Sequence, residues 1–174
     1  MTSIQNLNDP ALFQPSADMY TTQLVLVGGK LKLNDFNRCH FMYWNTTSNK
    51  ETCPYIYLDY NAGGFRSPEE YWYSLQSEKI DTYSFGNILY VLITETDPFE
   101  ELEDEKGGTF VKDLIKRGTR PEVSEEISNS SDPSIKALIH AMKMCHTHDW
   151  KSRPLASTIR DYLHNAIVNI SVET

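Results

Sequence analysis

A chain of 174 residues with 40% apolar residues can bury the core of one globular domain, and a second complete domain does not fit. The formal net charge of −8 argues against nucleic-acid binding, because phosphate backbones are bound by basic surfaces. Cys39, Cys53 and Cys145 lack the spacing of a zinc site, so we expect reduced thiols and no disulfide framework.

The sequence carries no sign of membrane targeting. Its first twenty residues lack the basic and apolar regions of a secretory signal. No apolar run approaches the roughly 18 residues that a membrane-spanning helix needs. We therefore expect a cytoplasmic location by default.

The first predicted element is a β-hairpin. Side chains alternate from Gln23 to Val27 and again from Lys30 to Leu33, on either side of Gly28-Gly29, which is typical of two strands joined by a tight glycine turn. The apolar residues from Asn37 to Gly64 follow neither a helical nor a strand period, so we expect a long loop there.

A short helix start and a long buried helix are predicted next. Ser67-Pro68-Glu69-Glu70 combines a capping serine, a proline at the first position and acidic residues in the first turn. Between Asp81 and Thr94 apolar residues nearly encircle the helix, which indicates burial on most sides. Thr96-Asp97-Pro98 should end it. Glu100 to Glu105 is expected to be an acidic patch in a loop, a solvated face rather than a docking site for a basic partner.

Three further helices are predicted downstream. Phe110 to Arg117 has the spacing of a short amphipathic helix with Phe110, Leu114 and Ile115 inward. Pro133 to His146 and Pro154 to Ile170 show stronger helical periodicity, with proline near each start. The histidines have no zinc-helix spacing and are expected at helix ends or on the surface: His40, His140, His146, His148 and His164.

Four spaced elements resemble the large lobe of protein kinases. Asp35-Phe36-Asn37 follows the hairpin where kinases carry Asp-Phe-Gly. Ser67-Pro68-Glu69 resembles the Ala-Pro-Glu that ends the activation segment. Asp81 matches the aspartate that begins the central helix, and Arg153 is similar to the family's late arginine. Together these elements imply a mainly α fold, the C-terminal lobe of a protein-kinase-like domain with one short β-hairpin, incomplete at its N-terminus. Thr82-Tyr83-Ser84-Phe85-Gly86 most resembles the tyrosine-kinase-like branch.

The resemblance implies roles for individual residues. Asp18 stands at the position of the catalytic-loop aspartate that accepts the substrate hydroxyl proton. Gln23 and Asp35 stand where the family holds Mg²⁺ against the phosphates of ATP. Phe36 is expected to pack in the core, and an aspartate in a cap or at a strand end is the alternative for Asp18 and Asp35.

Three further residues have implied architectural roles. Glu69 and Arg153 should form a buried ion pair, and removing one member of such a pair costs about 3 to 5 kcal/mol. Asp81 should accept backbone N–H groups of the catalytic loop.

The sequence departs from the family where catalysis needs it most. Ser16-Ala17-Asp18 replaces His-Arg-Asp, and Tyr20 replaces a lysine. Gln23 is one methylene longer than the usual asparagine, which weakens a Mg²⁺ site because the ion tolerates little departure from octahedral geometry. The glycine-rich loop, its lysine and the αC glutamate have no room before Asp18, so we expect the small lobe to be missing.

These observations divide the chain into an irregular segment at 1–17 and a kinase-like lobe at 18–170. Within the lobe we expect, in chain order, a catalytic-loop remnant at 18–23, the hairpin at 23–33, an activation-segment equivalent at 35–69 and a helical core at 70–170. Family activity is ATP-dependent phosphoryl transfer to protein hydroxyls with Mg²⁺, which this chain alone is not expected to support. The alternative is a pseudokinase lobe that acts as a protein-binding scaffold. Either function implies a protein substrate or partner.

Overall fold

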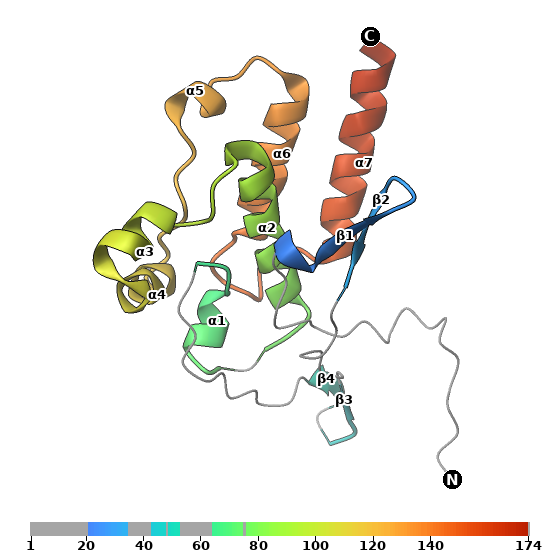
Figure 1. The fold of residues 1–174 in the computed structure, drawn as a ribbon. Helices are drawn as coiled ribbons and strands as arrows, with labels where there is room; N and C mark the ends of the chain where they lie inside the picture. Colours follow the sequence, from blue (N-terminus) through green and yellow to red (C-terminus); the bar gives the residue numbers. More distant parts are fainter. Residues whose placement is uncertain (1–20, 35–42, 48, 53–63, 75, 174) are drawn as a thin grey trace.

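The computed structural model describes residues 21–34, 43–47, 49–52, 64–74 and 76–173. These residues are mostly helical, with two separate two-stranded antiparallel sheets (Figure 1). None of the described helices is long and apolar enough to cross a membrane.

The first sheet is the predicted hairpin. A 3₁₀ turn, η2 (Thr21–Gln23), leads into β1 (Leu24–Val27), which pairs with β2 (Lys30–Leu33) so that Val27 lies opposite Lys30. Gly28 and Gly29 both have positive φ, at 58° and 73°, as a two-residue hairpin turn requires. The hairpin prediction is therefore confirmed.

The second sheet corrects the expectation of a continuous loop from Asn37 to Gly64. β3 (Tyr43–Asn45) and β4 (Lys50–Thr52) form a short antiparallel hairpin within that stretch. Aromatic residues in β3 favour a strand, and Asn49 takes the positive φ of 49° in the turn. Three-residue strands are too short to show a period, which is why the sequence pattern missed them.

The helical part begins with two helices that the sequence located well. α1 (Pro68–Tyr71) starts at the predicted serine and proline. α2 (Lys79–Thr94) begins two residues before the predicted Asp81 and is buried on most sides. It ends at Glu95, which adopts a left-handed conformation with φ of 60°.

The next two helices correct two expectations. α3 (Glu100–Lys106) is a helix where a loop was expected, because acidic residues in its first turn and Lys106 in its last complement the helix dipole. In α4 (Gly108–Lys116) the buried positions are Val111 and Ile115, whereas Phe110 is 44% exposed and does not face inward. Val111 and Ile115, which are four residues apart, therefore form the inward face of α4, and Phe110 does not belong to it.

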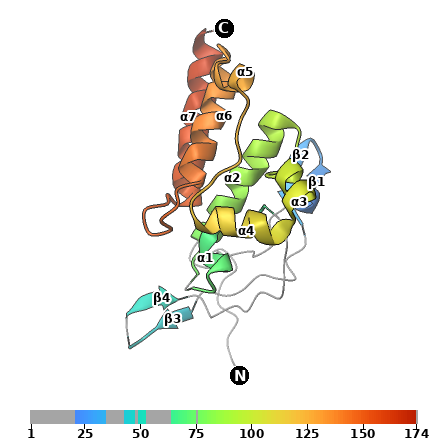
Figure 2. The same ribbon diagram turned by 90° about the vertical axis from the view of Figure 1, so that its left-hand side faces the viewer.

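Three helices complete the chain. α5 (Glu125–Ser128) is a single turn that the sequence analysis did not predict. α6 (Pro133–Cys145) and α7 (Ala156–Glu173) lie close to their predicted ranges. Both views show α6 and α7 running side by side, and α2 packs against α6 (Figures 1 and 2).

In this arrangement α2 contributes buried side chains to two hydrophobic clusters. Towards α6 and α7 it packs Leu89, Tyr90 and Ile93 against residues that include Ile159. Two turns before Tyr90, α2 contributes Tyr83 to a second cluster with residues of α1, α4 and the turn before α3, namely Tyr71, Phe99, Val111 and Ile115. The central helix therefore connects α1 to the rest of the core.

Candidate functional site

The candidate site is built around α1, whose start is specified by its own residues. The Glu70 carboxylate accepts hydrogen bonds from the N–H and from the hydroxyl of Ser67, each at 2.7 Å. Pro68 occupies the first helical position, where its missing N–H costs nothing. A four-residue helix is marginal by itself, so tertiary contacts must hold α1 in place.

The strongest of these contacts is a buried ion pair between Glu69 and Arg153. Arg153 Nη1 donates to Glu69 Oε1 at 2.6 Å and Nη2 donates to Oε2 at 3.0 Å, while the two side chains are 0 and 1% exposed. Arg153 also donates to the carbonyls of Lys79 at 2.8 Å and Thr147 at 2.9 Å. The bidentate pair therefore joins α1 to the first turn of α2 and to the segment that follows α6. It is the pairing that the resemblance implies for these two residues.

A second buried ion pair lies beside the first. Arg66 Nη1 is 3.2 Å from Glu70 Oε1, and both side chains are almost completely buried. Burial raises the pKa of Glu70 above its usual value, although Arg66 and the hydrogen bonds from Ser67 act in the opposite direction. Sequence reasoning missed this pair. The sequence pattern that could have indicated it is an arginine four residues before a glutamate at the capped start of a helix.

The ring of Tyr83 lies close to two guanidinium groups. The guanidinium carbons of Arg120 and Arg153 lie 5.1 and 5.0 Å from the centre of its ring, within cation–π range. Burial is the main reason why the pKa of Tyr83 rises to about 12. Among the described residues none hydrogen-bonds its buried hydroxyl group. Tyr83 thus contributes its ring to the site at the expense of an unsatisfied polar atom.

A buried polar pair joins α2 to the end of α6. His146 Nε2 is 2.9 Å from Asn87 Oδ1, and Asn87 Nδ2 donates to the carbonyls of Phe65 at 2.9 Å and Gly64 at 3.3 Å. His146 ends α6 as expected, but it is 6% exposed rather than on the surface. Burial lowers its pKa to about 3, with a further contribution from two nearby arginines. The signal that sequence reasoning missed is Asn87, an amide in an otherwise apolar stretch of α2.

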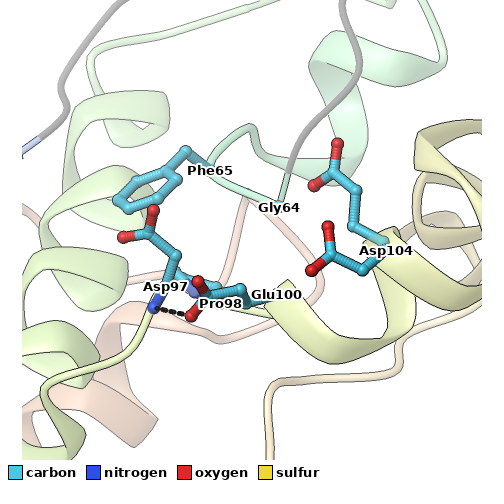
Figure 3. Close-up of a pocket in the computed structure, with 7 residues that line it drawn as sticks. Gly64, Phe65, Asp97, Pro98, Glu100 and Asp104 are labelled. Carbon is cyan, nitrogen blue, oxygen red and sulfur yellow. Dashed lines mark hydrogen bonds between the residues drawn. The ribbon is translucent and has the colours of Figure 1, made fainter.

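An acidic pocket of about 210 Å³ lies between the residues that precede α1 and the start of α3 (Figure 3). In Figure 3 Asp97 and Glu100 lie on one side and Asp104 on the other. Burial and the neighbouring aspartates raise the pKa of Glu103. The lining residues are four acids and a less polar wall: Asp97, Glu100, Glu103, Asp104, Gly64, Phe65 and Pro98.

The pocket has its shape because two backbone segments meet closely. A Cβ atom at Gly64 would collide with the carbonyl oxygen of Pro98, so glycine alone allows this approach. Phe99, which precedes α3, is held at a φ of 64°, a conformation that is strained for a bulky residue. Four carboxylates around a small cavity favour a cationic group over an anionic one.

The predicted nucleotide and metal residues are only partly described. Asp18, Asp35 and Phe36 lie outside the described residues. Gln23 ends η2, is half-buried, and its carbonyl accepts a hydrogen bond from the Asn34 N–H at 2.8 Å. One amide side chain does not make a Mg²⁺ site, and the described residues contain no cluster of three potential metal ligands. Asp81 lies half-buried in the first turn of α2.

Comparisons with known proteins point to kinases. No family model matches the chain. Mitogen-activated protein kinase kinase kinase 7 of Homo sapiens is 32% identical over 149 residues, which are 81% of this chain and 21% of that protein. Probable serine/threonine-protein kinase roco7 of Dictyostelium discoideum is 38% identical over 88 residues, which are 50% of this chain and 3% of that protein.

A third relative agrees with these two. Probable serine/threonine-protein kinase roco11 of Dictyostelium discoideum is 33% identical over 96 residues, 55% of this chain and 6% of that protein. The chain spans about a fifth or less of the length of these relatives. Similarity to proteins named as kinases over half to four fifths of the chain supports a protein-kinase-like domain here.

Proposed function

We propose that residues 18–170 form the helical lobe of a protein-kinase-like domain of the tyrosine-kinase-like branch, and that this lobe binds a protein segment beside α1. One observation carries the proposal. The bidentate pair between Glu69 and Arg153 holds α1 in place, and the backbone just before α1 forms one wall of the acidic pocket. A pocket with four carboxylates suits an arginine or lysine side chain of a protein substrate or partner.

Phosphoryl transfer is the chemistry proposed for the whole protein. By resemblance, Asp18 would accept the proton of the substrate hydroxyl, and Gln23 and Asp35 would hold Mg²⁺. ATP bound with that metal ion would supply the transferred phosphoryl group. Phe36 would support Asp35 by packing, and Asp81 would hold the loop that carries Asp18. For this chain taken by itself, we propose binding rather than catalysis, because its catalytic-loop residues depart from the family.

A scaffold without catalysis is the second candidate, and the first hairpin favours it. Leu26 is 71% exposed, Leu31 is 61% exposed and Val27 is 49% exposed. Apolar side chains grouped on one small sheet are typical of a surface that a partner covers.

Thermal melting with ATP and Mg²⁺ separates the two candidates. A surviving nucleotide site should raise the free energy of unfolding by about 2 to 3 kcal/mol at a ligand concentration of roughly 100 Kd. The effect should disappear in Asp35→Asn. If the wild-type chain shows no stabilisation, the nucleotide site is refuted for this chain and the scaffold is favoured.

Peptide binding tests the acidic pocket. A fluorescent peptide that carries two arginines should bind the chain, and its affinity should fall in Glu103→Gln, which removes one lining carboxylate. Glu101→Gln is the matched control, because Glu101 is an exposed residue of the same helix that does not line the pocket. Equal losses in both variants would show that only overall charge matters, and would contradict the pocket.

A further inference from the structure

A single buried side chain holds two peptide groups of the pocket wall. Asn87 is completely buried, and its amide nitrogen Nδ2 donates to Phe65 O at 2.9 Å and to Gly64 O at 3.3 Å. The Ser84 hydroxyl, about one turn earlier on α2, adds a hydrogen bond to Phe65 O at 3.3 Å. Because consecutive carbonyls are fixed by one rigid amide plane, the direction of the backbone at Gly64 and Phe65 is set by α2.

The orientation of Asn87 is set in turn by His146. Since Nδ2 of Asn87 donates to carbonyls, its Oδ1 must be the acceptor of the remaining hydrogen bond. His146 Nε2 therefore carries a proton, and the ring is the Nε2–H tautomer. With a pKa lowered to about 3, the ring stays neutral around pH 7 and keeps this tautomer.

Gly86 brings the histidine within reach. A Cβ atom at this position would lie 2.7 Å from Cys145 Cβ and 2.7 Å from His146 Cδ2. Helices α2 and α6 thus approach each other where α2 has no side chain. A chain of contacts runs from the end of α6, through Asn87, to the wall of the acidic pocket.

A polar pair at this place needs an explanation. The surrounding cluster on α2 and α6 is apolar, with Leu89, Met142 and Cys145 among its members. Burying an amide and an imidazole costs desolvation that an apolar pair of similar volume would avoid. What the polar pair adds is its hydrogen bonds to the two wall carbonyls.

We propose that Asn87 and His146 are positioning residues that fix the Gly64–Phe65 wall and thereby set the affinity of the acidic pocket for a cationic protein segment. The identity of the ligand rests on the proposed function, whereas the positioning rests on the contacts described above. Neither side chain is in contact with the ligand in this account. Asn87 acts through the wall backbone, and His146 acts through Asn87.

A double apolar variant tests the proposal in the full chain. Asn87→Leu with His146→Phe keeps the interface filled but removes both hydrogen bonds that Asn87 donates to the wall, so that only the hydrogen bond from the Ser84 hydroxyl to Phe65 O remains. Met142→Ala is the control, because it disturbs the same helix interface without touching the wall. We expect the double variant to bind the diarginine peptide about tenfold more weakly than wild type. The Met142→Ala control should bind the peptide with wild-type affinity, although its melting temperature should be lower than that of wild type.

Amide hydrogen exchange separates this proposal from the pocket function. If the wild-type chain fails to bind the peptide, the pocket function is refuted, and the positioning is decided by the exchange of the Phe65, Arg66 and Ser67 amides. Faster exchange in the double variant than in Met142→Ala supports positioning. Equal exchange in both variants overturns it, as does peptide affinity that is unchanged in the double variant. Imidazole ¹⁵N spectra give a further test, because an Nδ1–H tautomer of His146 would contradict the chain of contacts.

Discussion

The helical region and the first hairpin are held together by opposite means. Around α1, charged groups leave water and are paired, as Glu69 with Arg153 and Arg66 with Glu70. In β1 and β2, apolar side chains remain in water, and Leu26 is 71% exposed. The hairpin keeps its shape through its own backbone ladder and its glycine turn.

This difference shows where cooperativity lies in the chain. A buried charge that loses its partner is costly, so α1, the start of α2 and the segment after α6 must form or open together. A two-stranded hairpin with exposed side chains is marginal by itself and can open without disturbing the helices. The regions should therefore respond very differently to substitution and to pH.

The largest expected effect comes from breaking the central ion pair. Arg153→Met leaves the buried Glu69 carboxylate without a partner and should lower the free energy of unfolding by about 3 to 5 kcal/mol in urea titration. Lys32→Met, which also replaces a cation by methionine but on the exposed face of β2, should change it by less than about 0.5 kcal/mol. Similar losses in the two variants would remove the contrast between the regions.

Acid should weaken the helical region through His146. Its folded pKa of about 3 lies below the ordinary 6.5, so the unfolded chain binds more protons between these values and stability falls as pH drops. The loss approaches about 1.4 kcal/mol per pH unit below pH 6. In His146→Gln, which can still donate to Asn87, the free energy of unfolding should depend less on pH between 6 and 4. An unchanged slope would mean that the ring is not buried as a neutral group.

Gly86→Ala should act on the same contact by steric means. The added methyl group would press on Cys145 and His146, and overpacking of this kind costs about 1 to 3 kcal/mol. Calorimetry should show a lower melting temperature for this variant. A stabilised Gly86→Ala, as expected for an ordinary helix position, would show that α2 and α6 are not in close contact here.

The smallest expected effect is a gain. The Tyr83 hydroxyl is buried without a hydrogen-bond partner among the described residues, so Tyr83→Phe should stabilise the chain by about 1 kcal/mol. The ring would still lie close to the guanidinium groups of Arg120 and Arg153. A loss of stability in urea titration would reveal a hydrogen bond that the contacts do not show.

The elements that the sequence predicts well are those whose signals are local. The alternation around Gly28-Gly29 and the helical periods of α2, α6 and α7 depend only on neighbouring residues. The pairing of Glu69 with Arg153 was expected for a different reason, the resemblance to a family. Nothing in the spacing of residues 84 apart indicates that they meet.

The contacts that sequence reasoning missed join residues that are far apart in the sequence and meet only when the helices pack. Asn87 and His146 are 59 residues apart, and only the packing of α2 on α6 brings them together. The acidic run after Pro98 forms a helix rather than a loop because its charges match the helix dipole, an effect that the charge pattern alone does not distinguish from a solvated loop. Assignments for Asp18, Asp35 and Phe36 stay predictions.

Native-state hydrogen exchange of α1 tests the central claim most directly. Isolated four-residue helices do not persist, so the amides of Tyr71 and Trp72 are protected only if the buried ion pairs hold α1 to the core. We predict that they exchange with the same opening free energy as amides in the middle of α2, while amides of β1 exchange through local opening. Exchange of the α1 amides as fast as those of β1 would contradict the account.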